Sequence, residues 1–267
     1  MATQAITLTS GRNRARINPH GARLEALSIH DLDIIVPLDV DGPVFAGAFP
    51  MIPWCGLLRG ATFPFDGEAQ QVTADWGDHA LHGVVREADW SVVDGGANWV
   101  ELQLALPASW PLGGVASCRL ELQDDHLTLR WSVTAGPSGM PATVGWHPWF
   151  RRDLAGDALD VVTGFSAQWA RSGTGEPLGR WRPVAPPPWD DSFLSATPVL
   201  LRWGHRLEVE VSGTGGIYSV YDAAEKGVVV ATQTAPHETF GHTLEADAHL
   251  DLEVRLAWTL PAESSAS

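Results

Sequence analysis

Apolar and polar residues alternate strictly along several stretches of this chain, and this alternation constrains the fold more than any other feature. Residues 100–106 (VELQLAL) and 250–258 (LDLEVRLAW) each place every second side chain on one apolar face. A period of two is typical of half-buried β-strands. Two further runs, at 119–123 and 127–133, flank the tripeptide DDH, which is typical of a β-hairpin. No stretch of ten or more residues has the period of an amphipathic helix, so the sequence predicts an all-β protein.

Stretches rich in glycine and proline, such as PLGG, AGPSG and SGTGG, separate the predicted strands. Many short strands with such turns predict antiparallel sheets that pack face to face or close on themselves. The proline-rich loop at 183–188 does not mark a domain boundary, because alternating strands continue after it. We expect one β-sandwich domain over residues 1–260 and a flexible tail over residues 261–267.

The charge and the apolar patterning indicate which partners are not expected. The formal net charge is −15 at pH 7, whereas nucleic acids and anionic membrane surfaces usually bind clustered positive charge. No apolar run approaches the roughly 18 residues that a membrane-spanning helix needs. The first residues lack the pattern of a secretory signal, and the two cysteines suit a reducing compartment. We therefore expect a cytoplasmic protein that binds neither nucleic acid nor membrane.

Two histidines stand in stretches that could carry chemistry. His147 lies within GWHPWF, between Trp146 and Trp149, and His82 lies within LHG. Stiff aromatic surface around an imidazole fits either a packed core or an acid–base group beside a ligand-shaped wall. The sequence contains neither a glycine-rich phosphate loop before a helix nor a Cys/His metal cluster, so we expect no metal and no cofactor.

Several motifs together resemble the aldose 1-epimerase, or galactose mutarotase, family. They occur in the family's order and through most of the chain: NPHGARLEAL, FPMIPWCGLLRGATFPFDG, LHG, GWHPWF, WDDSF and VVVATQTAPHETF. The resemblance implies a large antiparallel β-sandwich of the galactose mutarotase type, whose concave face binds a monosaccharide. It also implies interconversion of the α and β anomers of a free hexose, by acid–base opening and closing of the sugar ring.

The resemblance assigns roles to individual residues. His147 is implied to be the acid at the ring oxygen, and His82 to bind and polarise the sugar. Asp190, in WDDSF, is implied to hold sugar hydroxyls, and the other predicted substrate-binding residues are Arg59, Trp146, Trp149 and Gln233. Three tryptophans near the histidines are candidates to stack on a sugar ring: Trp54, Trp146 and Trp149. His237 and His242 are interpreted as exposed histidines of a loop.

Two positions depart from the family pattern. Ala231 stands where the family has its general base, a glutamate, and Leu57 stands where an arginine commonly contacts the sugar. Either the alignment is shifted by a residue or two, or another carboxylate such as Glu238 or Asp222 substitutes. The third possibility is a sugar-binding protein with little or no epimerase activity.

A sugar-phosphate epimerase is a further alternative within the same chemistry. It would need a cluster of arginines beside the pocket, because guanidinium groups match the geometry of phosphate oxygens. The candidates are Arg59, Arg86, Arg151 and Arg152.

Overall fold

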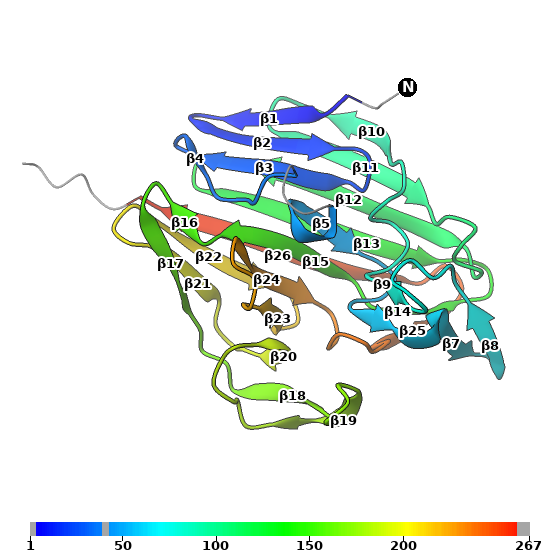
Figure 1. The fold of residues 1–267 in the computed structure, drawn as a ribbon. Coiled ribbons are helices and arrows are strands. Elements are labelled where there is room, and N and C mark those ends of the chain that lie inside the picture. The colour runs from blue at the N-terminus through cyan, green and yellow to red at the C-terminus, as the bar shows by residue number, and fades with distance from the viewer. Residues whose placement is uncertain (1–3, 39–42, 261–267) are drawn as a thin grey trace, which may run out of the picture.

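Residues 4–38 and 43–260 are described by the computed structural model, in which two large antiparallel sheets dominate the fold (Figure 1). The predicted tail at 261–267 lies outside the described residues. The first sheet has 11 strands, in the order β1-β2-β3-β5-β15-β24-β23-β20-β18-β19 with β4 beside β3. These strands are β1 (Ile6–Ser10), β2 (Asn13–Asn18), β3 (Arg23–Ile29), β4 (Leu32–Asp33), β5 (Ala48–Met51), β15 (Gly145–Arg151), β18 (Ala167–Arg171), β19 (Pro177–Arg182), β20 (Asp190–Leu194), β23 (Ile217–Tyr221) and β24 (Gly227–Gln233).

The second sheet has nine strands, in the order β10-β11-β12-β13-β26-β22-β21-β17-β16. They are β10 (Ser91–Gly95), β11 (Trp99–Ala105), β12 (Gly114–Leu122), β13 (His126–Ala135), β16 (Asp153–Leu154), β17 (Asp157–Val162), β21 (Val199–Trp203), β22 (Leu207–Gly213) and β26 (His249–Thr259). Three small pairs complete the strands: β6 (Leu57–Leu58) with β9 (Ala80–Leu81), β7 (Thr62–Phe65) with β8 (Glu68–Gln71), and β14 (Met140–Ala142) with β25 (His242–Leu244). The helical turns of the described residues are the 3₁₀ turns η1 (Pro43–Phe45) and η2 (Arg59–Ala61).

The strands that the alternation predicts are present. Residues 100–106 fall mainly on β11 and residues 250–258 on β26, with alternate side chains buried. The hairpin predicted around DDH is the antiparallel pair β12 and β13. The all-β prediction and the antiparallel sandwich are therefore confirmed.

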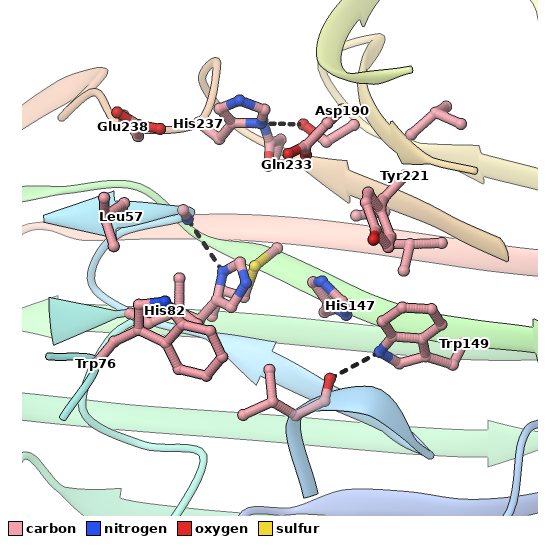
Figure 2. Close-up of a pocket in the computed structure, with 18 of the residues that line it drawn as sticks. Leu57, Trp76, His82, His147, Trp149, Asp190, Tyr221, Gln233, His237 and Glu238 are labelled. Atoms are coloured by element: carbon pink, nitrogen blue, oxygen red, sulfur yellow. Dashed lines mark hydrogen bonds between the residues drawn. The ribbon is translucent and has the colours of Figure 1, made fainter. Parts of the chain in front are cut away.

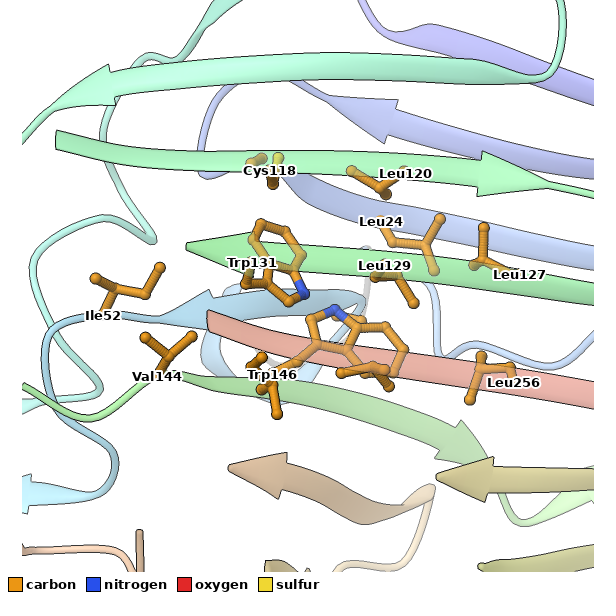
Figure 3. Packing of buried hydrophobic residues seen from close by; sticks show 14 of the residues in the cluster. Leu24, Ile52, Cys118, Leu120, Leu127, Leu129, Trp131, Val144, Trp146 and Leu256 are labelled. Atoms are coloured by element: carbon orange, nitrogen blue, oxygen red, sulfur yellow. The ribbon is translucent and has the colours of Figure 1, made fainter. Parts of the chain in front are cut away.

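The main core lies between the two large sheets. Trp131 on β13 and Trp146 on β15 belong to one cluster of buried side chains and lie near each other between the layers (Figure 3). Both are almost completely buried. Large aromatic side chains fill such an interface efficiently, because each removes a wide apolar area from water.

Strands β15 and β24 are buried on both faces, and this property positions the functional site. On β24, Val228 and Val230 join the core between the sheets, whereas Val229 and Ala231 belong to a second, smaller apolar cluster on the opposite face. Successive side chains of a strand point to opposite faces. One strand therefore supplies both the core and the floor of a pocket.

Candidate active site

A pocket lies on the face of the 11-stranded sheet that points away from the second sheet. Its volume is about 290 Å³, near the lower end of the roughly 300–1,000 Å³ typical of small-molecule sites. Side chains from β15, β18, β20, β23 and β24 line it, together with the segments around residues 44–57, 76–82 and 237–238. Figure 2 shows Asp190, Gln233 and His237 along one wall, facing His147 and Trp149 on the other side.

The two predicted catalytic histidines meet in this pocket. The ring centroids of His82 and His147 are 4.7 Å apart, with an interplanar angle of 60°. His147 comes from the middle of β15, and His82 follows the short strand β9. The concave pocket that the resemblance implies is thus present beside both imidazoles.

His82 is held in an unusual backbone conformation with a φ of 59°. The next residue, Gly83, packs so tightly that a Cβ added there would lie 2.0 Å from the carbonyl oxygen of Ile52. Only glycine allows this approach, which explains the HG pair of the sequence. Non-glycine residues with positive φ persist where the surrounding structure holds them, often at functional sites.

One hydrogen bond determines the tautomer of His82. The backbone N–H of Gly56 donates to His82 Nδ1 over 3.1 Å, so this nitrogen carries no proton. Burial lowers the pKa of His82 well below its ordinary value, and the nearby charges of His147 and Arg86 lower it further. At neutral pH the ring is therefore neutral with its proton on Nε2, which makes Nε2 a hydrogen-bond donor.

His147 stacks on Phe49 of β5, with ring centroids 4.8 Å apart and planes inclined by 10°. Its Nδ1 is buried and has no hydrogen-bond partner among the described residues. The nitrogen that can reach a ligand in the pocket is therefore Nε2. Burial lowers the pKa of His147 to about 3. A hydrogen bond with its own backbone raises this pKa, and the charges of Arg23 and Arg86 lower it further.

The wall opposite His147 carries polar groups. Asp190 is the first residue of β20 and is exposed. Partial desolvation raises the pKa of its carboxyl group despite the nearby charge of Arg171. Gln233 donates from Nε2 to Ser192 Oγ over 3.1 Å, while its buried Oε1 has no hydrogen-bond partner in the described part of the chain. These groups are suited to sugar hydroxyls, which both donate and accept.

Trp149, one of the predicted substrate-binding residues, lines the pocket. Its indole Nε1–H donates to the carbonyl oxygen of Val44 over 2.8 Å. This bond satisfies the polar end of the side chain, so the flat apolar part of the ring is available to a ligand.

Both departures from the family pattern are located in the pocket. Ala231 and Leu57 line it, so the pocket has a methyl group and an isobutyl group at these two places. Of the two carboxylates considered as substitutes, Glu238 lines the pocket. Asp222 does not, and it accepts a hydrogen bond from the backbone N–H of Trp189 over 2.6 Å.

Arg171 is a pocket residue that no sequence pattern indicated. It ends β18, and its Nη1 donates to Glu238 Oε1 over 2.8 Å and to the carbonyl oxygen of Gly175 over 2.6 Å. Arg59 lies on the other side of Glu238, with 3.2 Å between Arg59 Nη2 and Glu238 Oε2. Nothing in the stretch AQWAR distinguishes this arginine from a surface residue of a strand.

Three predicted positions need correction. Trp146 is completely buried between the sheets and does not line the pocket, because the alternation of β15 turns it away from its neighbours His147 and Trp149. Arg59 also lies outside the pocket lining and is bound to Glu238. Trp54 packs on Trp110 in the core, with ring centroids 6.0 Å apart.

The loop histidines differ from each other. His242 is exposed, as expected. The expectation was wrong for His237, which is only 8% exposed and lines the pocket. Its Nδ1 lies 3.1 Å from Ser219 Oγ, and burial lowers its pKa to about 3.

The arginines proposed for phosphate do not gather at the pocket. Arg86 is bonded to Asp75 and to Glu87, and Arg151 donates to the carbonyl oxygen of Ile35. Arg152 donates to the carbonyl oxygen of Ala224. None of these three lines the pocket.

Residues 4–38 and 43–260 contain no group of three or more His, Cys, Asp or Glu side chains arranged to hold a metal ion. They also contain no helix of the length and apolarity that crossing a membrane requires.

The fold and the pocket define a class of antiparallel β-sandwich proteins that carry a histidine-containing pocket on one sheet. The chain belongs to the aldose 1-epimerase family, whose model matches residues 4–200. None of the curated proteins matches the sequence.

Solved structures share the fold at low sequence identity. A putative aldose 1-epimerase from Escherichia coli K12 has 19% identity and a TM-score of 0.83, with 96% of this chain and 99% of that chain covered. Galactose 1-epimerase from Lactobacillus acidophilus NCFM has 15% identity and a TM-score of 0.79, with 96% and 94% covered. A galactose mutarotase-like protein from Clostridium acetobutylicum has 13% identity and a TM-score of 0.83, with 96% and 95% covered.

Proposed function

We propose that the protein interconverts the α and β anomers of a free hexose by opening and closing the sugar ring. The observation that carries this proposal is the convergence of His82 and His147, with ring centroids 4.7 Å apart, on one pocket of the sheet. The reaction needs an acid at the ring oxygen and a base at the anomeric hydroxyl. Family membership supports the same reaction class.

In this proposal His147 Nε2 donates a proton to the ring oxygen when the C1–O5 bond breaks. His82 donates a hydrogen bond from Nε2 to the sugar, because its Nδ1 is occupied by the N–H of Gly56. Asp190 binds the anomeric hydroxyl group and Gln233 binds another hydroxyl group, and the ring of Trp149 packs against the apolar face of the sugar. The cofactor-free reaction uses side chains alone.

The lining charges favour a free sugar over a sugar phosphate. The arginines nearest the pocket, Arg171 and Arg59, both form ion pairs with Glu238. A dianionic phosphate would have to compete with this carboxylate for them. The proposed substrate is accordingly an uncharged hexose.

A second candidate function is sugar binding without turnover, and Ala231 favours it. A positioned general base contributes about 10² to 10⁴ in rate, and the methyl group of Ala231 cannot accept a proton. A binding protein and an enzyme differ in one measurable property, the rate at which bound sugar changes anomer.

The test is exchange NMR of glucose and galactose at anomeric equilibrium, with and without the purified protein. Turnover predicts cross-peaks between the α and β anomeric protons that grow with protein concentration. Line broadening by the protein without such cross-peaks would support the binding function. Neither effect, with either sugar, would contradict both.

A further inference from the structure

Ring opening needs a group that accepts the proton of the anomeric hydroxyl, and the pocket shows which carboxylate is free to do so. This inference rests on the proposed function. Three carboxylates lie at or beside the pocket, namely Glu238, Asp190 and Asp191, and Asp222 is a more distant candidate. These four carboxylates differ in the hydrogen bonds and ion pairs that they form.

Glu238 forms ion pairs through both carboxylate oxygens, although only Oε1 accepts a hydrogen bond among the described residues. Arg171 Nη1 lies 2.8 Å from its Oε1, and Arg59 Nη2 lies 3.2 Å from its Oε2. The two guanidinium groups lie where a sugar hydroxyl would have to approach the carboxylate. Glu238 therefore serves better to hold Arg171 than to remove a proton.

Asp191 and Asp222 are also occupied. Asp191 accepts a hydrogen bond of 2.6 Å from Gln168 Nε2, and its other oxygen lies 3.4 Å from Arg171 Nε. The Asp222 carboxylate accepts from the backbone N–H of Trp189. Neither residue lines the pocket.

Asp190 differs from all three. It lines the pocket, and no hydrogen bond or ion pair to its carboxylate forms within the described part of the chain. Figure 2 shows its side chain on the wall opposite His147, next to Gln233. A sugar ring between these walls would meet an acid on one side and an unpaired carboxylate on the other.

We propose that Asp190 is the general base of the reaction, acting on the hydroxyl group at the anomeric carbon. The Asp190 carboxylate accepts the O1–H proton while the C1–O5 bond breaks and C1 becomes an aldehyde carbon. His147 is neutral at pH 7 because its pKa is about 3, so it first takes up a proton from solvent. The imidazolium then gives its Nε2 proton to O5, so Asp190 gains one proton and His147 loses one. After rotation about the C1–C2 bond, both transfers reverse and the ring closes on the other face.

Asp190 is exposed at the pocket, and the loss of part of its hydration raises the pKa of its carboxyl group above the ordinary value. A stronger base is a more effective proton acceptor. The raised pKa and the absence of a bonded partner thus act in the same direction.

The experiment compares wild type with Asp190→Asn, Ala231→Glu, the double variant Asp190→Asn/Ala231→Glu and the exposed control Asp160→Asn. Anomer exchange is measured by NMR for each protein. Affinity is measured separately with 1-deoxyglucose, which lacks the anomeric hydroxyl and cannot open. Thermal unfolding of each variant checks that it is folded.

The proposal predicts that Asp190→Asn lowers kcat by about 10² to 10⁴ and changes the Kd for 1-deoxyglucose by less than about threefold. It predicts that the double variant recovers most of the rate, since a carboxylate at 231 faces the same pocket. Asp160→Asn should behave like wild type.

Three results would overturn the proposal. One is wild-type kcat in Asp190→Asn. Another is a large rise in the Kd for 1-deoxyglucose with unchanged kcat, which would make Asp190 a binding group. The third is a slow double variant although Ala231→Glu alone is active. Absence of exchange in the wild type would contradict the proposed function itself, before any variant is compared.

Discussion

The imidazole of His147 lies against the ring of Phe49, with centroids 4.8 Å apart and almost parallel planes. The guanidinium carbon of Arg23 lies 4.7 Å from the centre of the same phenyl ring. A buried cation, an aromatic ring and an imidazole therefore follow one another in a single stack beside the pocket. The stack fixes the plane of His147 and places a positive charge close to it.

Replacing Arg23 with methionine should raise the pKa of His147. The charge of Arg23 disfavours the imidazolium form, so its removal leaves burial as the main cause of the lowered pKa of about 3. NMR titration of the His147 ring protons in Arg23→Met and wild type measures the change. An unaltered or lower pKa in the folded variant would show that the stack does not tune this histidine.

Folding stability should fall on acidification, in part because of the buried histidines. The pKa of His147 and that of His237 are each about 3 in the folded protein, whereas an unfolded histidine has a pKa of about 6.5. Above pH 6.5 both states are neutral, and these groups do not alter the free energy of unfolding. Between about pH 6.5 and 3 the unfolded state binds more protons. Each group therefore lowers the free energy of unfolding by about 1.4 kcal/mol for every unit by which the pH falls.

The variant His147→Gln isolates one of these contributions. Urea unfolding of wild type and variant at pH 7 and pH 5 gives the pH dependence of the free energy of unfolding for each. The variant should lose less stability than wild type between the two pH values. Equal losses would mean that His147 is protonated equally in the folded and unfolded chains.

Arg171 should contribute to sugar affinity. Its Nε and Nη1 face Asp191, Glu238 and Gly175, while Arg171 also lines the pocket. A hydrogen bond from a charged donor is worth about 1.5–3 kcal/mol, so Arg171→Met should weaken 1-deoxyglucose binding by about ten- to a hundredfold.

Arg180→Met is the matched control for this prediction, because Arg180 is exposed on the neighbouring strand β19. It should bind 1-deoxyglucose like wild type. Equal affinities of Arg171→Met and Arg180→Met for 1-deoxyglucose would show that Arg171 does not contribute to sugar binding.

Trp146 should contribute to folding stability and not to sugar binding. It is completely buried between the sheets, and replacing a buried tryptophan with alanine typically costs about 3–5 kcal/mol. The larger replacement Trp146→Leu should lower the midpoint of urea unfolding while leaving the Kd for 1-deoxyglucose within about twofold. A loss of affinity in the folded variant would show that Trp146 contributes to sugar binding.

The period-two pattern predicted the strands because it reports burial along a single strand. The same pattern explains why the prediction that Trp146 binds the sugar was wrong. Adjacent residues of a strand face opposite ways, so Trp146 and His147 could not both face the sugar. The core strand β24, GVVVATQ, has no visible alternation, since both of its faces are buried.

The composition of the pocket was less predictable than the strands. The meeting of His82 with His147 followed from family resemblance and not from spacing. His237 and Arg171 reach the pocket through long-range packing, with Ser219 and Glu238 respectively. No local signal marks such contacts, because their partners lie in other strands and loops.

We expect His147 to transfer a proton to a sugar held beside His82. Exchange NMR of glucose and galactose with wild type, His147→Gln and the control Asp160→Asn measures this transfer. Wild type and control should both exchange the anomers, and His147→Gln should do so at a rate lower by about 10² to 10⁴. Exchange by folded His147→Gln at the wild-type rate would mean that His147 is not the acid.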